Sequence, residues 1–156
     1  MRPVFPAPAG APAHLLFRLP LPPNIANPGR SVGGNWKASH FAKKKYMANA
    51  GATIAQQLGN IPTLFKADLR ATFHVRTPFD QDNLMRLLKW PLDTLTMVGL
   101  VRDDREAYCR IIELPTQVAI GRIRRRKTES YQDYLVRRHK RDGKLGVWIQ
   151  IWERTR

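Results

Sequence analysis

Residues 66–77, KADLRATFHVRT, alternate apolar and polar side chains. Leu69, Ala71, Phe73 and Val75 share one side of an extended chain, because successive side chains of a strand point to opposite faces. A repeat of two predicts a strand with one face buried and one face open. This strand is the element around which the rest of the chain has to be arranged.

Two helices and three further strands are predicted around it. Good helix formers indicate helices over residues 39–58 and 82–98, and Gly59 and Gly99 end them. Pro91 is expected to bend or restart the second helix. Strands are expected within residues 14–23, 101–115 and 145–153. The order of these elements predicts a single α+β domain with one mixed β-sheet and two main helices.

The chain of 156 residues is long enough for one domain. Residues 1–13 are rich in Pro and Ala, lack the apolar core of a signal peptide, and are expected to be a disordered leader, while residues 14–156 form the domain. No apolar run approaches the ~20 residues of a membrane span, so we expect a cytoplasmic protein. The single cysteine, Cys109, excludes an internal disulfide and is expected to be a buried thiol.

The charge of the chain points to a polyanionic partner. There are 27 Lys and Arg against 12 Asp and Glu, a formal net charge of +15. Nucleic acid is the leading candidate for such a partner. An anionic membrane surface is the weaker one, because no long basic helix with a clean apolar face is found.

The acids are concentrated in one short segment. Five of the 12 fall within residues 80–104, namely Asp80, Asp82, Asp93, Asp103 and Asp104. The spacing of the first two puts both carboxylates on one face of an extended chain, which costs free energy unless a cation lies between them. Lys, Arg or Mg²⁺ can supply that cation. Alternatively, Asp82 is a helix N-cap, and the last two acids form an ordinary turn.

The second predicted helix carries a charged face. Arg86, Lys89 and Asp93 follow Asp82 by four, seven and eleven residues. At about 100° per residue these offsets fall within roughly 40° of one direction. A solvated row of ion pairs and a phosphodiester-cleaving site both have this pattern. Whether Asp104 can reach the first two acids depends on how the chain runs at Pro91.

Three motifs in order, LPLPPNIANPG, DQDNLMRLLKWPLDTL and GLVRDD, resemble the RusA family of Holliday junction resolvases. These are small endonucleases common in phages and prophages. The resemblance extends over residues 19–104, more than half of the chain. It implies a RusA-like fold, a homodimer that binds four-way DNA junctions, and metal-assisted hydrolysis that nicks two opposing strands in recombination and repair.

The resemblance also implies roles for individual residues. Asp80, Asp82 and Asp104 match the family's metal-binding aspartates, with Mg²⁺ as the ion and Mn²⁺ as a substitute. The catalytic lysine matches Lys89 when the count runs back from the downstream aspartate, and Arg86 when it runs forward, because this helix is about one turn longer than the family pattern. We favour Lys89.

A second departure from the family is a basic insertion at about residues 117–144, where relatives have a short turn. From residue 122 to 144 it holds ten Lys and Arg against three Asp and Glu. Its structure is left open between helix, loop and disorder, and its role between a DNA-binding arm and a solvated loop. The candidate DNA contacts are Arg70, Arg76, Arg86, Lys43, Lys44, Lys45, Arg124, Arg125 and Arg126.

Three classes of function therefore stay open. The first, a structure-selective DNA endonuclease, is favoured by the motifs. The second is a binder of DNA or RNA without catalytic activity, which would tolerate removal of metal. The third is a structural protein of a ribosome or virion, for which the charge and size are equally suitable.

Overall fold

The computed structural model describes residues 14–23 and 36–154. The predicted leader at residues 1–13 lies outside the described residues. So does the loop predicted after the first strand, apart from its last residue, Trp36.

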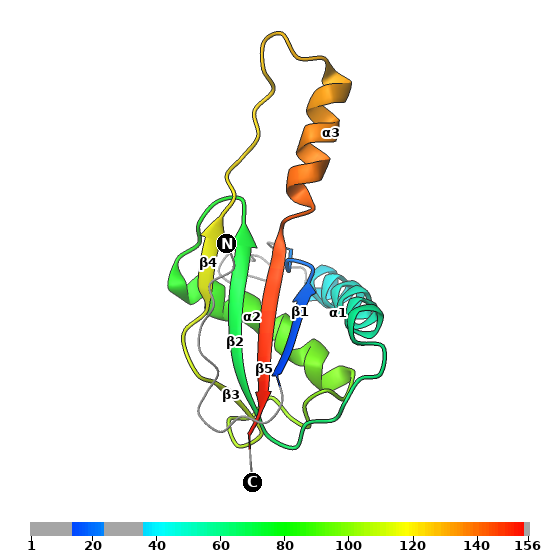
Figure 1. Ribbon diagram of the computed structural model, residues 1–156, viewed down its shortest axis with the longest axis vertical. Coiled ribbons are helices and arrows are strands. Elements are labelled where there is room, and N and C mark those ends of the chain that lie inside the picture. Colours follow the sequence, from blue (N-terminus) through cyan, green and yellow to red (C-terminus); the bar gives the residue numbers. More distant parts are fainter. Residues whose placement is uncertain (1–13, 24–35, 155–156) are drawn as a thin grey trace.

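The centre of the fold is a five-stranded mixed sheet (Figure 1). Strand β2 (Ala67–Val75) pairs antiparallel with β5 (Gly146–Glu153), which pairs antiparallel with the edge strand β1 (His14–Leu19). On the other side of β2, β3 (Cys109–Ile111) and β4 (Thr116–Ala119) follow one another and both run parallel to it. The prediction of a single α+β domain with a mixed sheet is confirmed.

The alternation in β2 is confirmed residue by residue. Leu69, Ala71, Phe73 and Val75 are buried, and the intervening residues are partly exposed. Strand β5 supplies Val147, Ile149 and Ile151 to the same core. Because side chains of neighbouring strands lie opposite one another in the ladder, these residues form a continuous apolar face.

Two helices cover the apolar face. Helix α1 (Trp36–Leu58) packs on β1 and on α2 (Gln81–Met97), and α2 crosses behind the sheet in Figure 1. Helix α2 continues through Pro91 as one helix, so a restart there is wrong. Burial of the apolar stripe that includes Leu84, Leu88 and Leu95 outweighs the hydrogen bond that proline cannot make.

The basic insertion forms an arm. After β4 the chain runs outward, turns, and returns as a third helix, α3 (Tyr131–Asp142), which projects beyond the sheet (Figure 1). The Ser130 side chain caps this helix by accepting a hydrogen bond from the Asp133 backbone N–H. No residue of α3 is buried. The structure therefore has a third helix besides the two main helices that were predicted, and this helix has no apolar core of its own.

Cys109 lies in β3 and is 4% exposed, as predicted. Burial raises the pKa of its thiol to about 11, so the thiol stays protonated near neutral pH and is a poor nucleophile. No helix within the described ranges combines the length and apolar character that a membrane crossing needs.

Candidate functional site

Asp80 and Asp82 lie where the chain leaves β2 and enters α2. Asp80 occupies the N-cap position, with φ −65° and ψ 154°, but its side chain makes no capping hydrogen bond. Asp82 lies in the first turn, so the alternative that Asp82 is the N-cap is wrong. Both side chains are exposed, and neither makes a hydrogen bond or ion pair with a described residue. The two carboxylates are therefore open to a cation.

Placing these two acids close together in the chain costs electrostatic free energy, and the start of helix α2 offsets part of that cost. Two like charges two residues apart repel each other. The positive end of the α2 dipole stabilises negative charge at this place. A cation bound between the carboxylates would remove the remaining repulsion.

The loop before Asp80 is fixed by Gln117 of β4. The Gln117 amide accepts a hydrogen bond from the Phe79 N–H at 2.8 Å and donates one to the Phe79 carbonyl at 2.7 Å. One residue beyond Asp80, the Gln81 side chain donates to the Pro115 carbonyl at 3.0 Å. The edge of the sheet therefore holds both sides of Asp80 in place.

Two other acids of the segment, Asp93 and Asp104, contact Lys89, halfway along α2. The Lys89 ammonium donates to the carboxylate of Asp104 and lies 3.0 Å from Asp93. Lys43 of α1 lies 2.6 Å from the second oxygen of Asp93. The hydrogen bond with Asp104, more than the contacts with Asp93, raises the pKa of Lys89 above its usual range. Lys89 is therefore a permanent cation, held between two carboxylates.

Asp103 and Asp104 have different roles. Asp103 accepts hydrogen bonds from the Arg105 backbone and guanidinium, both at 2.9 Å, as expected for an ordinary turn. These contacts hold the pKa of Asp103 below its usual value. Asp104 instead turns toward α2 and Lys89. Of the two neighbours, only Asp104 joins the charged face of the helix.

The structure does not bring the three predicted metal ligands together. In the described part of the chain, no group of three or more His, Cys, Asp or Glu side chains is arranged to hold a metal ion. Asp104 is engaged with Lys89, seven residues and roughly 10 Å along the helix axis from Asp82. Asp80 and Asp82 alone still fit Mg²⁺, which often binds through one or two carboxylates, with water and substrate phosphate completing its shell.

The predicted DNA contacts fall into two groups. Lys43, Arg70 and Arg76 are ion-paired with Asp93, Glu113 and Asp142, respectively, so part of their charge is used inside the protein. The others are exposed, namely Arg86, Lys44, Lys45, Arg124, Arg125 and Arg126. The exposed group is the one available to a phosphate backbone.

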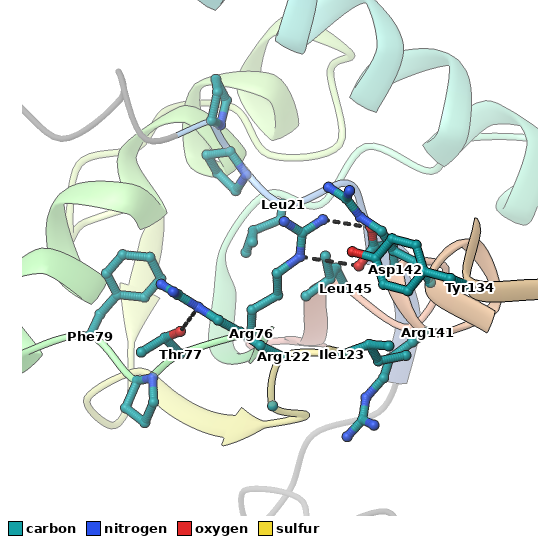
Figure 2. A pocket seen from close by; sticks show the side chains of 15 residues that line it. Leu21, Arg76, Thr77, Phe79, Arg122, Ile123, Tyr134, Arg141, Asp142 and Leu145 are labelled. Atoms are coloured by element: carbon teal, nitrogen blue, oxygen red, sulfur yellow. Dashed lines mark hydrogen bonds and ion pairs between the residues drawn. The ribbon is translucent and has the colours of Figure 1, made fainter. Parts of the chain in front are cut away.

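Sequence reasoning missed a cavity at the base of the arm (Figure 2). It has a volume of about 700 Å³, and its walls include Arg76, Arg122, Arg138 and Arg141. Arg122 and Arg141 stand at the two ends of the insertion. An insertion that leaves and re-enters one sheet must bring its ends together, and that signal in the sequence could have found the cavity.

Comparison with known proteins does not assign the chain to a family. No protein-family model matches the chain. A search of curated proteins finds no significant match either. The resemblance to the RusA family therefore rests on the three sequence motifs alone.

Proposed function

We propose that this protein is a metal-dependent, structure-selective DNA endonuclease that nicks four-way junctions. The observation that carries the proposal is the pair of exposed carboxylates, Asp80 and Asp82, which have no partner among the described residues. In a chain of net charge +15, acids without a basic partner at a helix N-terminus are unusual. A divalent cation and a DNA phosphate are the natural partners of such a pair.

Asp80 and Asp82 would hold the Mg²⁺ ion, which supplies an activated water and neutralises charge on the scissile phosphate. Lys89, fixed by Asp104, presents a cation on the same helix and would stabilise negative charge that develops on the phosphate. The family pattern favours Lys89 over Arg86 as the catalytic cation; Lys89 shares its charge with Asp93 and Asp104, whereas Arg86 makes no ion pair with a described residue. Asp104 would act through Lys89, by holding its ammonium on the charged face of α2.

DNA binding is supported by the placement of basic residues. The arm carries Arg124, Arg125 and Arg126 at exposed positions beyond the end of the sheet. A projecting basic arm suits a branched substrate, whose strands diverge from the crossover. We include a homodimer in the proposal, because a four-way junction presents two equivalent strands and a twofold pair of subunits matches that symmetry. Such an enzyme acts in the cytoplasm.

A second candidate is a DNA-binding protein without catalysis. It is favoured by one observation, that no group of three acids forms a metal site among the described residues. The two candidates differ in their need for metal: a mere binder is indifferent to EDTA and to loss of Asp82.

The test is a nicking assay on a synthetic four-way junction with and without Mg²⁺. The wild-type protein should introduce paired nicks only with metal. Asp82→Asn keeps the shape of the side chain but loses its charge, and should lower the nicking rate at least about 100-fold while junction binding survives.

Glu106→Gln, which removes an exposed acid elsewhere, is the matched control and should cut at the wild-type rate. Intact junctions under Mg²⁺ and Mn²⁺ would refute the enzyme and leave the binder. Normal cutting by Asp82→Asn would show that the metal is held elsewhere.

A further inference from the structure

The cavity at the base of the arm lies between three parts of the chain. Its walls come from the segment after β2, from both ends of the arm, and from the residues that follow β1. Its volume of about 700 Å³ is in the usual range for sites that take small molecules. Figure 2 shows arginine side chains from these different elements around one space.

The charge of the cavity is unbalanced. Asp142 is the one acid in its lining, and it is used by Arg76, which donates to it at 2.6 and 3.1 Å. Arg122 donates instead to the Thr77 hydroxyl, and Arg141 to the Ile120 carbonyl. Neither of these two arginines is paired with an acid of the described chain. Their guanidinium groups keep a full positive charge, and further N–H donors, at the wall of the cavity.

The remaining walls are aromatic and aliphatic. Phe79 and Tyr134 are both half-buried, and Leu21 and Leu145 lie beside them in the lining. A bare inorganic anion would gain nothing from these apolar walls. A nucleotide unit would gain from both the arginines and the apolar walls. Guanidinium groups bind phosphate in a forked geometry, and aromatic side chains pack on sugars and bases.

The cavity is adjacent to the candidate active site in the chain. Thr77 and Phe79 line it, and Asp80 is the next residue. The contact of Arg122 with Thr77 at 3.2 Å ties the arm to this same loop. A group bound here would therefore lie beside the segment that carries the unpaired acids.

We propose that this cavity binds a phosphate-bearing nucleotide unit of the DNA strand, with Arg122 and Arg141 as the phosphate ligands. The inference rests on the proposed function for the identity of the strand, and deepens it by giving the enzyme a second anchor next to the cut. The phosphate is either an internal diester or the monoester of a strand end. Both share the chemistry that the arginines recognise.

The experiment is calorimetric titration of the full chain, in EDTA, with thymidine, thymidine 5′-monophosphate and the dinucleotide TpT. Both phosphate-bearing probes should bind at least about tenfold more tightly than thymidine, the difference expected for one charge-assisted hydrogen bond. Equal or tighter binding of TpT identifies a backbone diester, and tighter binding of the monophosphate identifies a strand end. Binding of thymidine as tight as that of the probes would overturn the proposal.

Arg122→Gln and Arg141→Gln should each weaken binding of the phosphate-bearing probes about tenfold. Lys127→Gln removes the same charge from an exposed part of the arm outside the cavity, and should leave binding of these small probes unchanged. Equal weakening by all three would show general attraction by net charge and overturn the assignment. Arg141→Lys, which keeps the charge but loses the fork, should be intermediate and controls for folding.

The two proposals fail separately. Asp82→Asn should bind the probes as the wild-type protein does, because the cavity does not include that carboxylate. A protein that binds the probes but never cuts a junction would keep the cavity and lose the nuclease. A protein that cuts junctions but whose probe binding ignores Arg122 and Arg141 would keep the nuclease and lose the cavity.

Discussion

Lys89 is the residue in which the candidate site is most tightly coupled to the fold. Its ammonium is shared by Asp93 and Asp104, which come from within α2 and from the turn after it. The hydrogen bond to Asp104 raises the pKa of Lys89 above its ordinary value of 10.5. A raised pKa means that the ion pair stabilises the fold fully below pH 10.5, and that this contribution is lost as the pH rises through the higher folded value.

Removal of this cation should slow the chemical step and spare binding. Lys89→Gln should lower the single-turnover nicking rate about 100-fold, the usual loss for one group that stabilises transition-state charge. Lys89→Arg should recover part of the rate, because the positive charge returns in a different shape. Lys66→Gln, a lysine with no place in the proposed site, is the control.

The same residue gives a pH prediction. Since Lys89 stays protonated, the nicking rate should show no loss from its titration up to about pH 10. A fall in rate with a midpoint well below that pH, absent in Lys89→Arg, would contradict the role given to Lys89.

For single residues, the sequence predicted where the exposed acids lie in the chain better than which charged side chains contact one another. The spacing of Asp80 and Asp82 was interpreted for an extended chain, but Asp80 is the N-cap of α2 and Asp82 lies in its first helical turn. Contact between Lys89 and Asp104 depends on how the turn after α2 folds back, which spacing does not determine. Arg70 and Lys43, two of the predicted DNA contacts, are ion-paired with Glu113 and Asp93. The sequence does not show these pairs, because the partners are distant in the chain.

Among the elements, the contact of β4 with the loop before α2 is the one on which the proposed activity should depend most. Gln117 holds the Phe79 backbone through two hydrogen bonds. Gln117→Leu keeps the volume and loses both bonds, so the loop that carries Asp80 should move. Small displacements of catalytic groups can cost about 100-fold in rate, so we expect a loss between tenfold and that value.

The readout for Gln117→Leu is the nicking rate at saturating DNA, together with the Mg²⁺ concentration that gives half the maximal rate. Because the variant displaces a ligand without removing it, excess Mg²⁺ should restore part of the rate. No such rescue is expected for Asp82→Asn. A normal rate at low Mg²⁺ would show that the two hydrogen bonds between Gln117 and Phe79 do not affect the position of the acids.

The arm is held by polar contacts centred on Glu129. Its carboxylate accepts hydrogen bonds from Arg137 at 2.6 and 2.7 Å, and from the Arg126 backbone N–H at 3.0 Å. The Arg137 contacts, more than the backbone bond, lower the pKa of Glu129 from 4.5 to about 2. A lowered pKa means that this contribution is present above pH 4.5 and is lost as the pH falls through about 2.

Glu129→Gln should therefore loosen the arm at neutral pH. Amide hydrogen exchange within α3 should speed up, while the amides of β2 and β5 keep their protection. In the wild-type protein the same loosening should develop between pH 4.5 and 2. Glu106→Gln is the control, and unchanged exchange in α3 would show that other contacts hold the arm.

The elements divide by how much apolar surface they bury. Strand β2 and helix α2 were predicted to within two residues, because their buried stripes impose a clear period on the sequence. No residue of helix α3 is fully buried and charged residues dominate its sequence, so its structure was left open. The contact between Arg137 and Glu129 links charged residues eight positions apart, and local propensity does not show it.

For the whole molecule, the distribution of charge should control DNA affinity. Replacing residues 122–144 by a short glycine-containing turn removes ten basic and three acidic residues. Junction binding should weaken, and the slope of log affinity against log salt concentration should fall by about 0.9 for each phosphate that the arm no longer neutralises. The measurement is a salt titration of junction binding with the intact and shortened chains.

The shortened chain should remain folded, since α3 contributes no residue to the core. Its melting temperature should therefore stay close to that of the intact chain. An unchanged salt slope would show that the arm does not touch DNA. A collapsed melting temperature would show that the arm, through Arg76 and Asp142, supports the sheet more than its exposure indicates.

The arm leaves the sheet at β4 and re-enters it at β5, on either side of β2, whose pairing with both strands already fixes their register. The length of the arm can therefore change without disturbing the strands on which it is mounted. How far the protein reaches would then be set independently of the proposed chemistry, and a longer or shorter arm would be a direct way to retarget it.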